Sequence, residues 1–136
     1  MKKAIICDID GTLAEKGERN PFDYTTVDQD TLIVPVAETV KALAKHGYAI
    51  LIFSGREDSC FEMTLRWLKR HKIPCEMLRL RKTGDRRKDS IVKKEIFETV
   101  KDKYDIHFAL DDRNQMVDMY RQELNLPCFQ VAPGDF

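Results

Sequence analysis

The chain has 136 residues, of which 43% are hydrophobic and 34% are charged, with 23 basic and 23 acidic side chains. This length fits one domain, 1–136, and this composition excludes disordered, collagen-like and mini-protein classes. At the scale of the whole chain, a formal net charge of zero argues against a nucleic-acid partner.

Acidic and basic residues are unevenly distributed along the chain. Residues 66–94 hold 12 Lys or Arg and three acids, whereas the other 107 residues hold 11 Lys or Arg and 20 acids. The zero net charge therefore combines a basic tract with an acidic remainder, and the two can serve different partners.

The sequence contains no membrane or targeting signal. No apolar run reaches the roughly 18 residues of a transmembrane helix, and Asp8 interrupts the N-terminal apolar run too early for a signal peptide. Four cysteines, Cys7, Cys60, Cys75 and Cys128, form no CxxC pair and no metal-ligand spacing. We expect no membrane association, free buried or half-buried thiols, and a cytoplasmic location.

Short apolar runs alternate with segments of helical period. The first run, 4–7, predicts a buried strand, and the mostly polar residues 14–34 predict a loop or small flap. A helix is expected to begin at Pro35 and to end at Gly47. A second buried strand is expected over 48–53.

The rest of the chain continues this alternation. Further strands are expected at 76–80, 106–110 and 128–131. Further helices are expected at 61–68, stopping near Pro74, at 91–100 and at 116–124. The pattern predicts an α/β, Rossmann-like fold, with a five-stranded, mostly parallel sheet and helices on both faces.

Polar side chains follow the predicted strands, where the ligand crevice of an open α/β sheet lies. These side chains are Asp8 and Asp10 after the first strand, Ser54 and Arg56 after the second, and Asp111 and Asp112 after the fourth. Lys93 lies early in the helix between the third and fourth strands. We expect all of them to converge on one rim of the sheet.

Clustered carboxylates repel one another unless a cation neutralises them, and hard oxygen ligands favour Mg²⁺. A Mg²⁺ ion beside a lysine and a hydroxyl outlines a phosphate site. A carboxylate beside the metal can attack phosphorus and form an aspartyl-phosphate. A second carboxylate two residues further on can act first as an acid and then as a base.

Four segments, in order, resemble the motifs of the haloacid dehalogenase (HAD) superfamily: DIDGT at 8–12, FSGR at 53–56, Lys93, and LDDR at 110–113. More narrowly, the chain resembles the 3′-phosphatase domain of phage-type polynucleotide kinase/3′-phosphatase over almost its whole length. The similar segments include RNPFD at 19–23, the basic segment at 81–97, and QVAPGDF at 130–136. For a phage-encoded chain, the expected location is the host cytoplasm.

The resemblance implies a role for each motif residue. Asp8 is expected to be the nucleophile, and Asp10 to protonate the leaving oxygen and then activate water. Ser54 is expected to hydrogen-bond the phosphate, and Lys93 to neutralise charge on the phosphate and nucleophile. These four are the expected catalytic residues.

The resemblance also implies a ligand set for Mg²⁺, the expected cofactor. The ligands are the Asp8 carboxylate, the Asp10 backbone carbonyl and the later acidic pair, with Asp112 as the direct ligand and Asp111 in support. Residues expected to serve substrate binding are Thr12, Arg19, Gly55, Arg56, Arg81, Arg87 and Asp89.

Several of these residues also have an ordinary structural interpretation. Asp89 precedes a helical segment and is a natural N-cap, and Arg19 is compatible with an exposed polar loop. Arg56 can orient the carboxylates of the site without touching the substrate. Trp67 and Phe61 are expected to pack in the core, with base stacking as the alternative.

No segment of the chain can hold a cap domain, because residues 14–34 are too few and the second motif leads directly into a helix. An open crevice can admit the end of a polymer. The basic segment 79–88 follows the third strand near the same rim, where a single-stranded end could contact it. We therefore expect hydrolysis of 3′-phosphates at DNA or RNA ends, on single strands or duplex termini.

Two other functions are compatible with parts of this pattern. The nearer one is a HAD phosphatase acting on small nucleotides or sugar phosphates. A signalling receiver domain fits poorly, because its adjacent acidic pair follows the first strand and not the fourth. No GxxxxGK[ST] motif occurs, so we expect a free-standing phosphatase without P-loop kinase activity. Monomeric and dimeric states both remain open.

Overall fold

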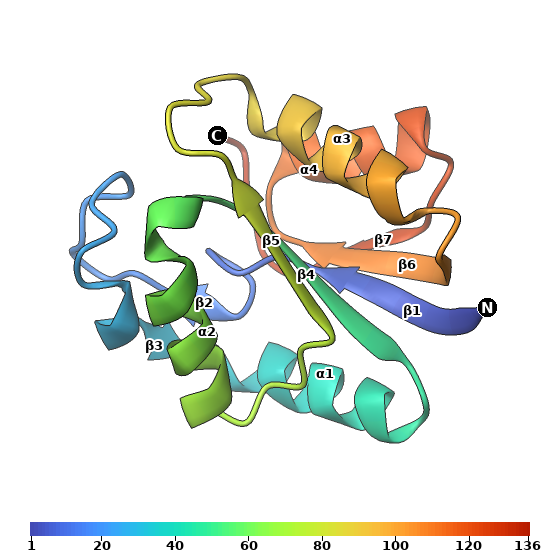
Figure 1. Ribbon diagram of the computed structural model, residues 1–136, viewed down its shortest axis with the longest axis horizontal. Coiled ribbons are helices and arrows are strands. Elements are labelled where there is room, and N and C mark those ends of the chain that lie inside the picture. Colours follow the sequence, from blue (N-terminus) through green and yellow to red (C-terminus); the bar gives the residue numbers. More distant parts are fainter.

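The computed structural model describes residues 1–136, which are organised around a five-stranded sheet (Figure 1). Its strands are β1 (Lys2–Cys7), β4 (Ala49–Glu57), β5 (Met77–Arg81), β6 (Tyr104–Asp111) and β7 (Cys128–Gln130). They lie in the order β5-β4-β1-β6-β7, and every neighbouring pair is parallel. This confirms the predicted α/β class and places the first strand at the centre.

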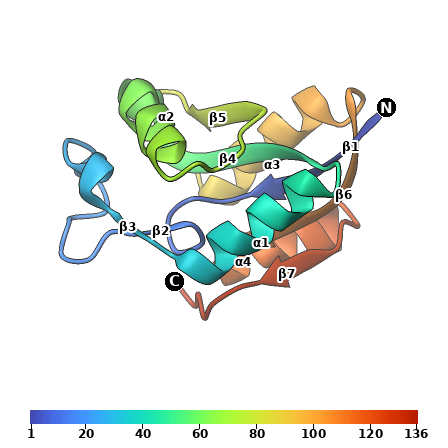
Figure 2. The same ribbon diagram turned by 90° about the horizontal axis from the view of Figure 1, so that it is seen from below.

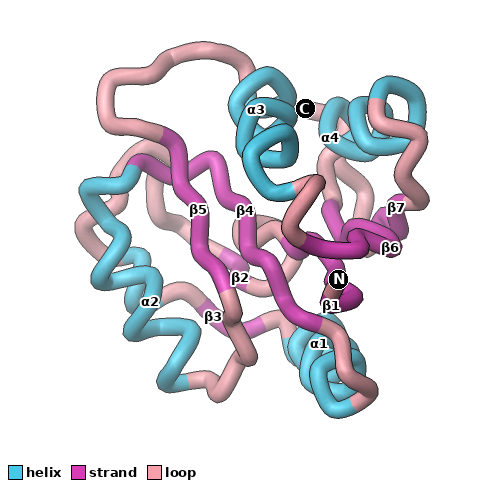
Figure 3. The backbone as a smooth tube through the Cα atoms, turned by 45° about the vertical axis from the view of Figure 1, so that its right-hand side comes forward, coloured by secondary structure: helices cyan, strands magenta, loops and turns pink.

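Helices cover both faces of the sheet (Figure 3). Helices α1 (Val34–Lys45) and α2 (Phe61–Arg70) cover one face, and α3 (Asp89–Val100) and α4 (Asn114–Asp118) cover the other. Because side chains alternate along a strand, Ile5 of β1 packs with the first pair and Ile6 with the second. Both faces of the central strands are therefore buried, as a parallel sheet requires.

The ends of the helices follow local sequence signals. Pro35 lies in the first turn of α1, and Gly47 follows the helix with φ of 98°, a conformation that favours glycine. Helix α2 ends at Arg70, before Pro74, where Lys72 turns the chain with φ of 58°. The chain after α4 continues as a π-helical turn, Met119–Glu123.

Residues 14–34, predicted as a loop or small flap, contain a two-stranded antiparallel sheet. Its strands are β2 (Ala14–Glu15) and β3 (Thr31–Leu32), and a 3₁₀ turn, Val27–Gln29, precedes β3. The segment between β2 and β3 projects beyond the main sheet (Figure 2). We call residues 14–33 the flap. No cap domain covers the sheet, as expected.

Strand β4 is longer than predicted. It was expected to end at Phe53, but its pairing with β5 resumes at Glu57, opposite Arg81, after a register shift. Such an irregularity re-aims side chains without ending the strand. Ser54 and Arg56 therefore lie within the distorted end of β4 rather than in a turn after it.

The structure also bears on the expectations for two aromatic residues, for the cysteines and for membrane-spanning helices. Trp67 is fully buried and Phe61 packs half-buried against the same core, so core packing is confirmed for both. All four cysteines are free, and three of them are buried. None of the helices has the length and apolar character needed to cross a bilayer.

Candidate active site

A cavity of about 1080 Å³ lies at the carboxyl ends of the central strands. The flap and the loop 82–88 between β5 and α3 contribute residues to its walls. Most of the predicted site residues line it: Asp8, Asp10, Arg19, Gly55, Arg56, Arg81, Arg87, Asp89, Lys93, Asp111 and Asp112. Only Thr12 and Ser54 do not, and both are fully buried. The expected convergence on one rim therefore holds for nearly the whole set.

Three carboxylates and one lysine form the floor of this cavity. Oxygens of Asp8, Asp111 and Asp112 lie within 4.8 Å of one another, and all three residues are buried. Lys93 Nζ donates to Asp8 at 2.7 Å and to Asp111 at 3.2 Å. Three negative charges thus share a buried site with one positive charge.

The charge imbalance is reflected in the acidities of these groups. Burial, followed by the neighbouring Asp111 carboxylate, raises the pKa of Asp8 well above its usual range despite the opposing effect of Lys93. Burial also raises the pKa of Asp112. Burial acts to lower the pKa of Lys93, but the Asp111 and Asp8 carboxylates outweigh it and raise that pKa. Hard carboxylate oxygens with surplus negative charge suit Mg²⁺, so the residues fit this ion.

Asp111 and Asp112 differ in how their oxygens are used. Asp111 Oδ1 accepts the backbone N–H groups of Asp112 and Arg113, while Oδ2 accepts from Lys93. The Asp112 carboxylate accepts only from the Thr12 hydroxyl, at 3.1 Å. Asp112 therefore has more free acceptor capacity for a metal, and the Thr12 hydroxyl helps to orient it.

Gly11 makes the close approach of Asp112 possible. Its φ is 83°, and a Cβ at this position would lie 2.9 Å from Asp112 Oδ1 and 2.6 Å from its Cγ. Any side chain would displace the carboxylate and would also be strained at this φ. The glycine of the DIDGT motif therefore provides space for Asp112, 101 positions away in the sequence.

Asp10 lies apart from the three-carboxylate cluster and is held by arginines. Arg56 donates to both of its oxygens, at 2.8 and 3.0 Å, and Arg19 donates to it at 3.4 Å. Both arginines also donate to Asp30, whose side chain is only 2% exposed. The predicted alternative for Arg56, orienting a carboxylate, is what this geometry shows.

Asp30 is a site residue that the sequence did not reveal. It lies in the polar flap, and its partners Arg19 and Arg56 are 11 and 26 positions away. Its backbone carbonyl also accepts the indole N–H of Trp67 at 2.9 Å. No local pattern distinguishes it from the other acids of the flap, although a buried arginine pair requires such a partner.

The Ser54 hydroxyl accepts the backbone N–H of Arg56 at 3.2 Å. The side chain is fully buried and is not among the residues that line the cavity. Its expected hydrogen bond to phosphate remains a prediction.

Asp89 belongs to a second ion-pair network rather than to a helix cap. Its carboxylate pairs with Arg81 at the end of β5 and with Arg113, at 2.7 Å, after β6. The N-cap position is Lys88, and no side chain caps the helix. A Cβ on Gly55 would lie 2.6 Å from the Asp89 carboxylate, so this glycine also provides space. Arg113, part of the LDDR motif, was given no role from the sequence.

The loop 82–88, which we call the basic loop, contains side chains that form ion pairs and others that do not. Arg87 pairs with Asp85 and Glu95, and Arg81 is buried beneath the loop, where it donates to backbone carbonyls of the loop. By contrast, Lys82, Arg86 and Lys88 are exposed and belong to none of the ion pairs. Of these three, Arg86 and Lys88 line the cavity.

These groups together can carry out a phosphoryl transfer. Asp8 lines the cavity with a carboxylate of the kind that can attack phosphorus, and Lys93 lies beside it, where it can balance negative charge. Asp10 lies two residues further on, with a side chain 44% exposed and accessible to a leaving group or to water. The three-carboxylate cluster can hold a divalent cation.

Comparisons with known proteins agree with this geometry. A family model described as the polynucleotide kinase PNKP phosphatase domain matches residues 2–136. A protein of Autographa californica nuclear polyhedrosis virus, named "Putative bifunctional polynucleotide kinase/RNA ligase", is 34% identical over 129 residues. That match covers 92% of this chain and 18% of the viral protein.

Solved structures extend the comparison. A chain of the Pnkp1/Rnl/Hen1 RNA repair complex is 50% identical, with a TM-score of 0.96 over 99% of this chain and 44% of that one. A class C acid phosphatase from Bacillus anthracis, 19% identical with a TM-score of 0.69, shares the fold over 85% of this chain and 53% of its own. The chain therefore corresponds to less than half of the repair-complex chain it matches.

Proposed function

Since the chain belongs to the PNKP phosphatase-domain family of the HAD superfamily, we propose that it is a Mg²⁺-dependent polynucleotide 3′-phosphatase. As a member of this family it is a phosphomonoesterase. Its proposed substrate is the 3′-phosphate at the end of an RNA strand, because a 50% identical chain belongs to an RNA repair complex. The observation that carries the proposal is the meeting of Asp8, Lys93 and the Asp111/Asp112 pair at the floor of an open cavity.

The proposed reaction has two steps. In the first, an Asp8 oxygen forms a bond to phosphorus while the bond from phosphorus to the 3′-oxygen breaks, and Asp10 gives its proton to that oxygen. In the second, Asp10 takes a proton from water as the water oxygen attacks phosphorus and the Asp8–phosphorus bond breaks. Inorganic phosphate and a 3′-hydroxyl end are the products, and both carboxyl groups return to their initial state.

Other residues of the chain support these steps. Lys93 contacts Asp8 and is placed to neutralise charge on the phosphate as it is transferred. Arg56 fixes the orientation of Asp10. Mg²⁺, held by Asp8, Asp112 and the Asp10 carbonyl, would neutralise the carboxylates and polarise the phosphate. Asp111 supports the site by accepting hydrogen bonds from Lys93 and from the backbone N–H groups of Asp112 and Arg113.

The shape of the cavity favours a polymer end over a small metabolite. No cap encloses it, and its walls are the flap on one side and the basic loop on the other. Arg86 and Lys88 offer unpaired charges to backbone phosphates, and Phe22 offers an apolar ring that is 84% exposed. Aromatic rings and cations along one groove are features of single-strand binding sites.

The deciding experiment compares phosphate release from three substrates. These are an RNA oligonucleotide with a 3′-phosphate, the same oligonucleotide with a 5′-phosphate, and a sugar phosphate. We expect kcat/KM to be at least about 100-fold higher for the first, and Asp8→Asn to abolish its turnover. Equal turnover of the sugar phosphate would overturn the proposal. A DNA oligonucleotide with a 3′-phosphate tests the choice of RNA.

A further inference from the structure

We infer that the C-terminal segment, residues 131–136, is a strap that holds the loop Asp111–Asn114 in the position its side chains need to bind metal. We call this segment the C-terminal strap. The inference rests on the proposed function, since it assumes that Asp112 is a metal ligand. It adds positioning residues that act on the site through the loop Asp111–Asn114.

Backbone hydrogen bonds join the strap to both ends of the loop. The Val131 N–H donates to the Asp111 carbonyl at 3.0 Å, and the Asn114 N–H donates to the Gly134 carbonyl at 2.8 Å. The Gln130 side-chain amide, just before the strap, donates to the Asp112 carbonyl at 2.9 Å. The loop thus makes three hydrogen bonds with one short stretch of chain, one with the last residue of β7 and two with the strap.

Gly134 packs directly against the backbone of the metal-binding residues. A Cβ at this position would lie well inside van der Waals contact with the Asp112 carbonyl oxygen and 2.6 Å from Arg113 Cα. Gly134 is buried, and its φ is outside the left-handed region. Glycine is therefore required here for space and not for its backbone conformation.

The end of the strap holds Arg113 as well. Arg113 Nε donates to the Phe136 carbonyl at 2.8 Å, and its guanidinium lies over the Phe136 ring, 5.1 Å from the centroid. The same guanidinium donates to Asp89 at 2.7 Å. The strap therefore contacts the loop residue that ties the metal site to the Asp89–Arg81 network.

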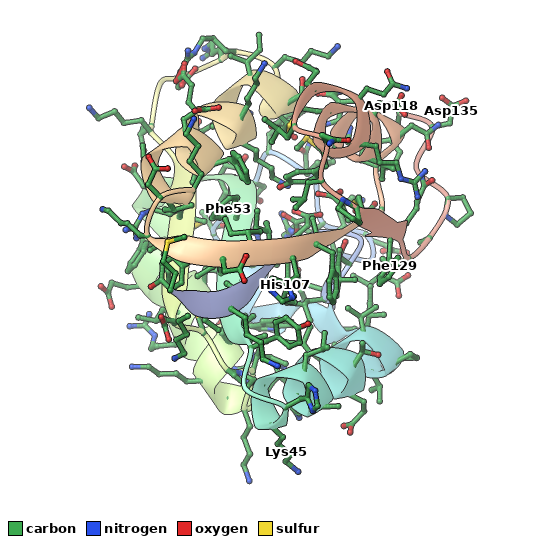
Figure 4. All side chains as sticks on the ribbon, turned by 90° about the vertical axis from the view of Figure 1, so that its right-hand side faces the viewer. Lys45, Phe53, His107, Asp118, Phe129 and Asp135 are labelled. Atoms are coloured by element: carbon green, nitrogen blue, oxygen red, sulfur yellow. The ribbon has the colours of Figure 1, made fainter.

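The strap lies alongside α4, the helix that begins in this loop. Figure 4 shows Asp135 on the same side of the sheet as Asp118 of α4. Asp135 contributes only a contact of 3.5 Å to the Asn114 side chain and is exposed. The holding contacts are thus made by the backbone and by Gly134, Gln130 and Phe136.

Gly134→Ala tests the inference, because it adds one methyl group without demanding a new backbone conformation. We expect the variant to fold with an unchanged circular dichroism spectrum. We also expect the Mg²⁺ concentration that gives half of the maximal thermal shift to rise at least about tenfold. Amide hydrogen exchange at 111–114 should be at least about tenfold faster. Asp135→Ala is the matched control in the strap and should change neither quantity.

Gln130→Met is the second variant, because the Gln130 side chain is exposed and its replacement leaves no cavity in the core. This variant should change the Mg²⁺ requirement and the amide exchange in the same direction as Gly134→Ala, but by less. For the RNA 3′-phosphate, its kcat should fall by a larger factor than its KM rises. Wild-type Mg²⁺ affinity and wild-type loop exchange in both variants would overturn the inference. If the wild-type protein lacks phosphatase activity, the proposed function fails, whereas the metal and exchange measurements still test the strap.

Discussion

Arg56 holds both carboxylate oxygens of Asp10, with Nη2 2.8 Å from Oδ1 and Nε 3.0 Å from Oδ2. The Arg56 side chain is 1% exposed, whereas that of Asp10 is 44% exposed. The proposed acid is thus fixed from inside the protein and open toward the cavity. Arg56 occupies only one lone-pair position on each oxygen, so Oδ2 keeps a second position at which Asp10 can hold and release a proton while Arg56 orients it.

Arg56→Lys tests this arrangement. A lysine keeps the positive charge but cannot donate to both oxygens in a planar, bidentate geometry. We expect kcat to fall by about 100-fold, as for loss of one well-placed catalytic contact, with a much smaller change in KM. Steady-state kinetics on the RNA 3′-phosphate measure both. Arg66→Lys, at an exposed position of α2, is the control, and a wild-type kcat in Arg56→Lys would contradict the orienting role.

Asp112→Asn should separate metal binding from folding. Removing one of three mutually repelling carboxylates should raise the melting temperature of the metal-free protein. At a Mg²⁺ concentration of about 100 times its dissociation constant, the free energy of unfolding of the wild-type protein should rise by about 2.7 kcal/mol. For a chain of this size, this corresponds to a melting temperature higher by roughly 8 °C. Asp112→Asn should lose this gain. Differential scanning fluorimetry with Mg²⁺ or EDTA measures it.

The control for the metal experiment is Asp118→Asn, on the neighbouring helix. Asp118 is exposed and belongs to none of the ion pairs, so the Mg²⁺-dependent shift should remain as in wild type. Retention of the full shift in Asp112→Asn would argue against Asp112 as a ligand.

Arg86→Ala with Lys88→Ala should weaken binding of the RNA strand but not of a small phosphate ester. Each lost phosphate contact on a single strand reduces the salt slope by about 0.7, so the double variant should lower the slope of log KM against log salt by about 1.4. Lys41→Ala with Lys45→Ala removes the same charge from α1. If both double variants behave alike, the effect is one of total charge.

Phe22→Ala should raise KM for the oligonucleotide about tenfold, within the range expected for one base–aromatic stack. Turnover of a generic phosphate ester should not change, because the ring lies on the flap and carries no group that takes part in the proposed reaction. Phe129→Ala removes another exposed ring, 58% exposed on β7 and outside the cavity, and should have no effect. An equal loss with the ester would place Phe22 in support of the catalytic groups.

The central part of the site is predictable from sequence because a parallel sheet gathers the ends of its strands. Asp8, Asp111 and Lys93 come together as expected, since buried apolar runs mark the strands and the carboxyl ends of parallel strands share one edge. The succession of strands and helices along the chain is also predictable, because short apolar runs alternate with segments whose apolar residues recur at helical spacing.

Residues whose role depends on distant partners could not be predicted in this way. Asp30 resembles any acid in a polar loop until the fold brings two buried arginines to it. Arg87 was expected to serve substrate binding, and its ion pairs with Asp85 and Glu95 could not be read from the sequence. Gly134 matters because of a backbone 22 positions earlier. Ion pairs and tight packing between residues so far apart in the sequence leave no local sequence pattern.

The place of β1 in the sheet has a consequence for the newly made chain. β1 precedes β4 and β6 in the sequence but pairs with both, and these strands end at residues 57 and 111. Contacts over such sequence separations form slowly, because a long stretch of chain must be closed into a loop first. Asp8, the proposed nucleophile, is therefore synthesised about a hundred residues before Asp111 and Asp112, which share its site. The proposed phosphatase site can be complete only after Asp112 has been synthesised and β6 has paired with β1.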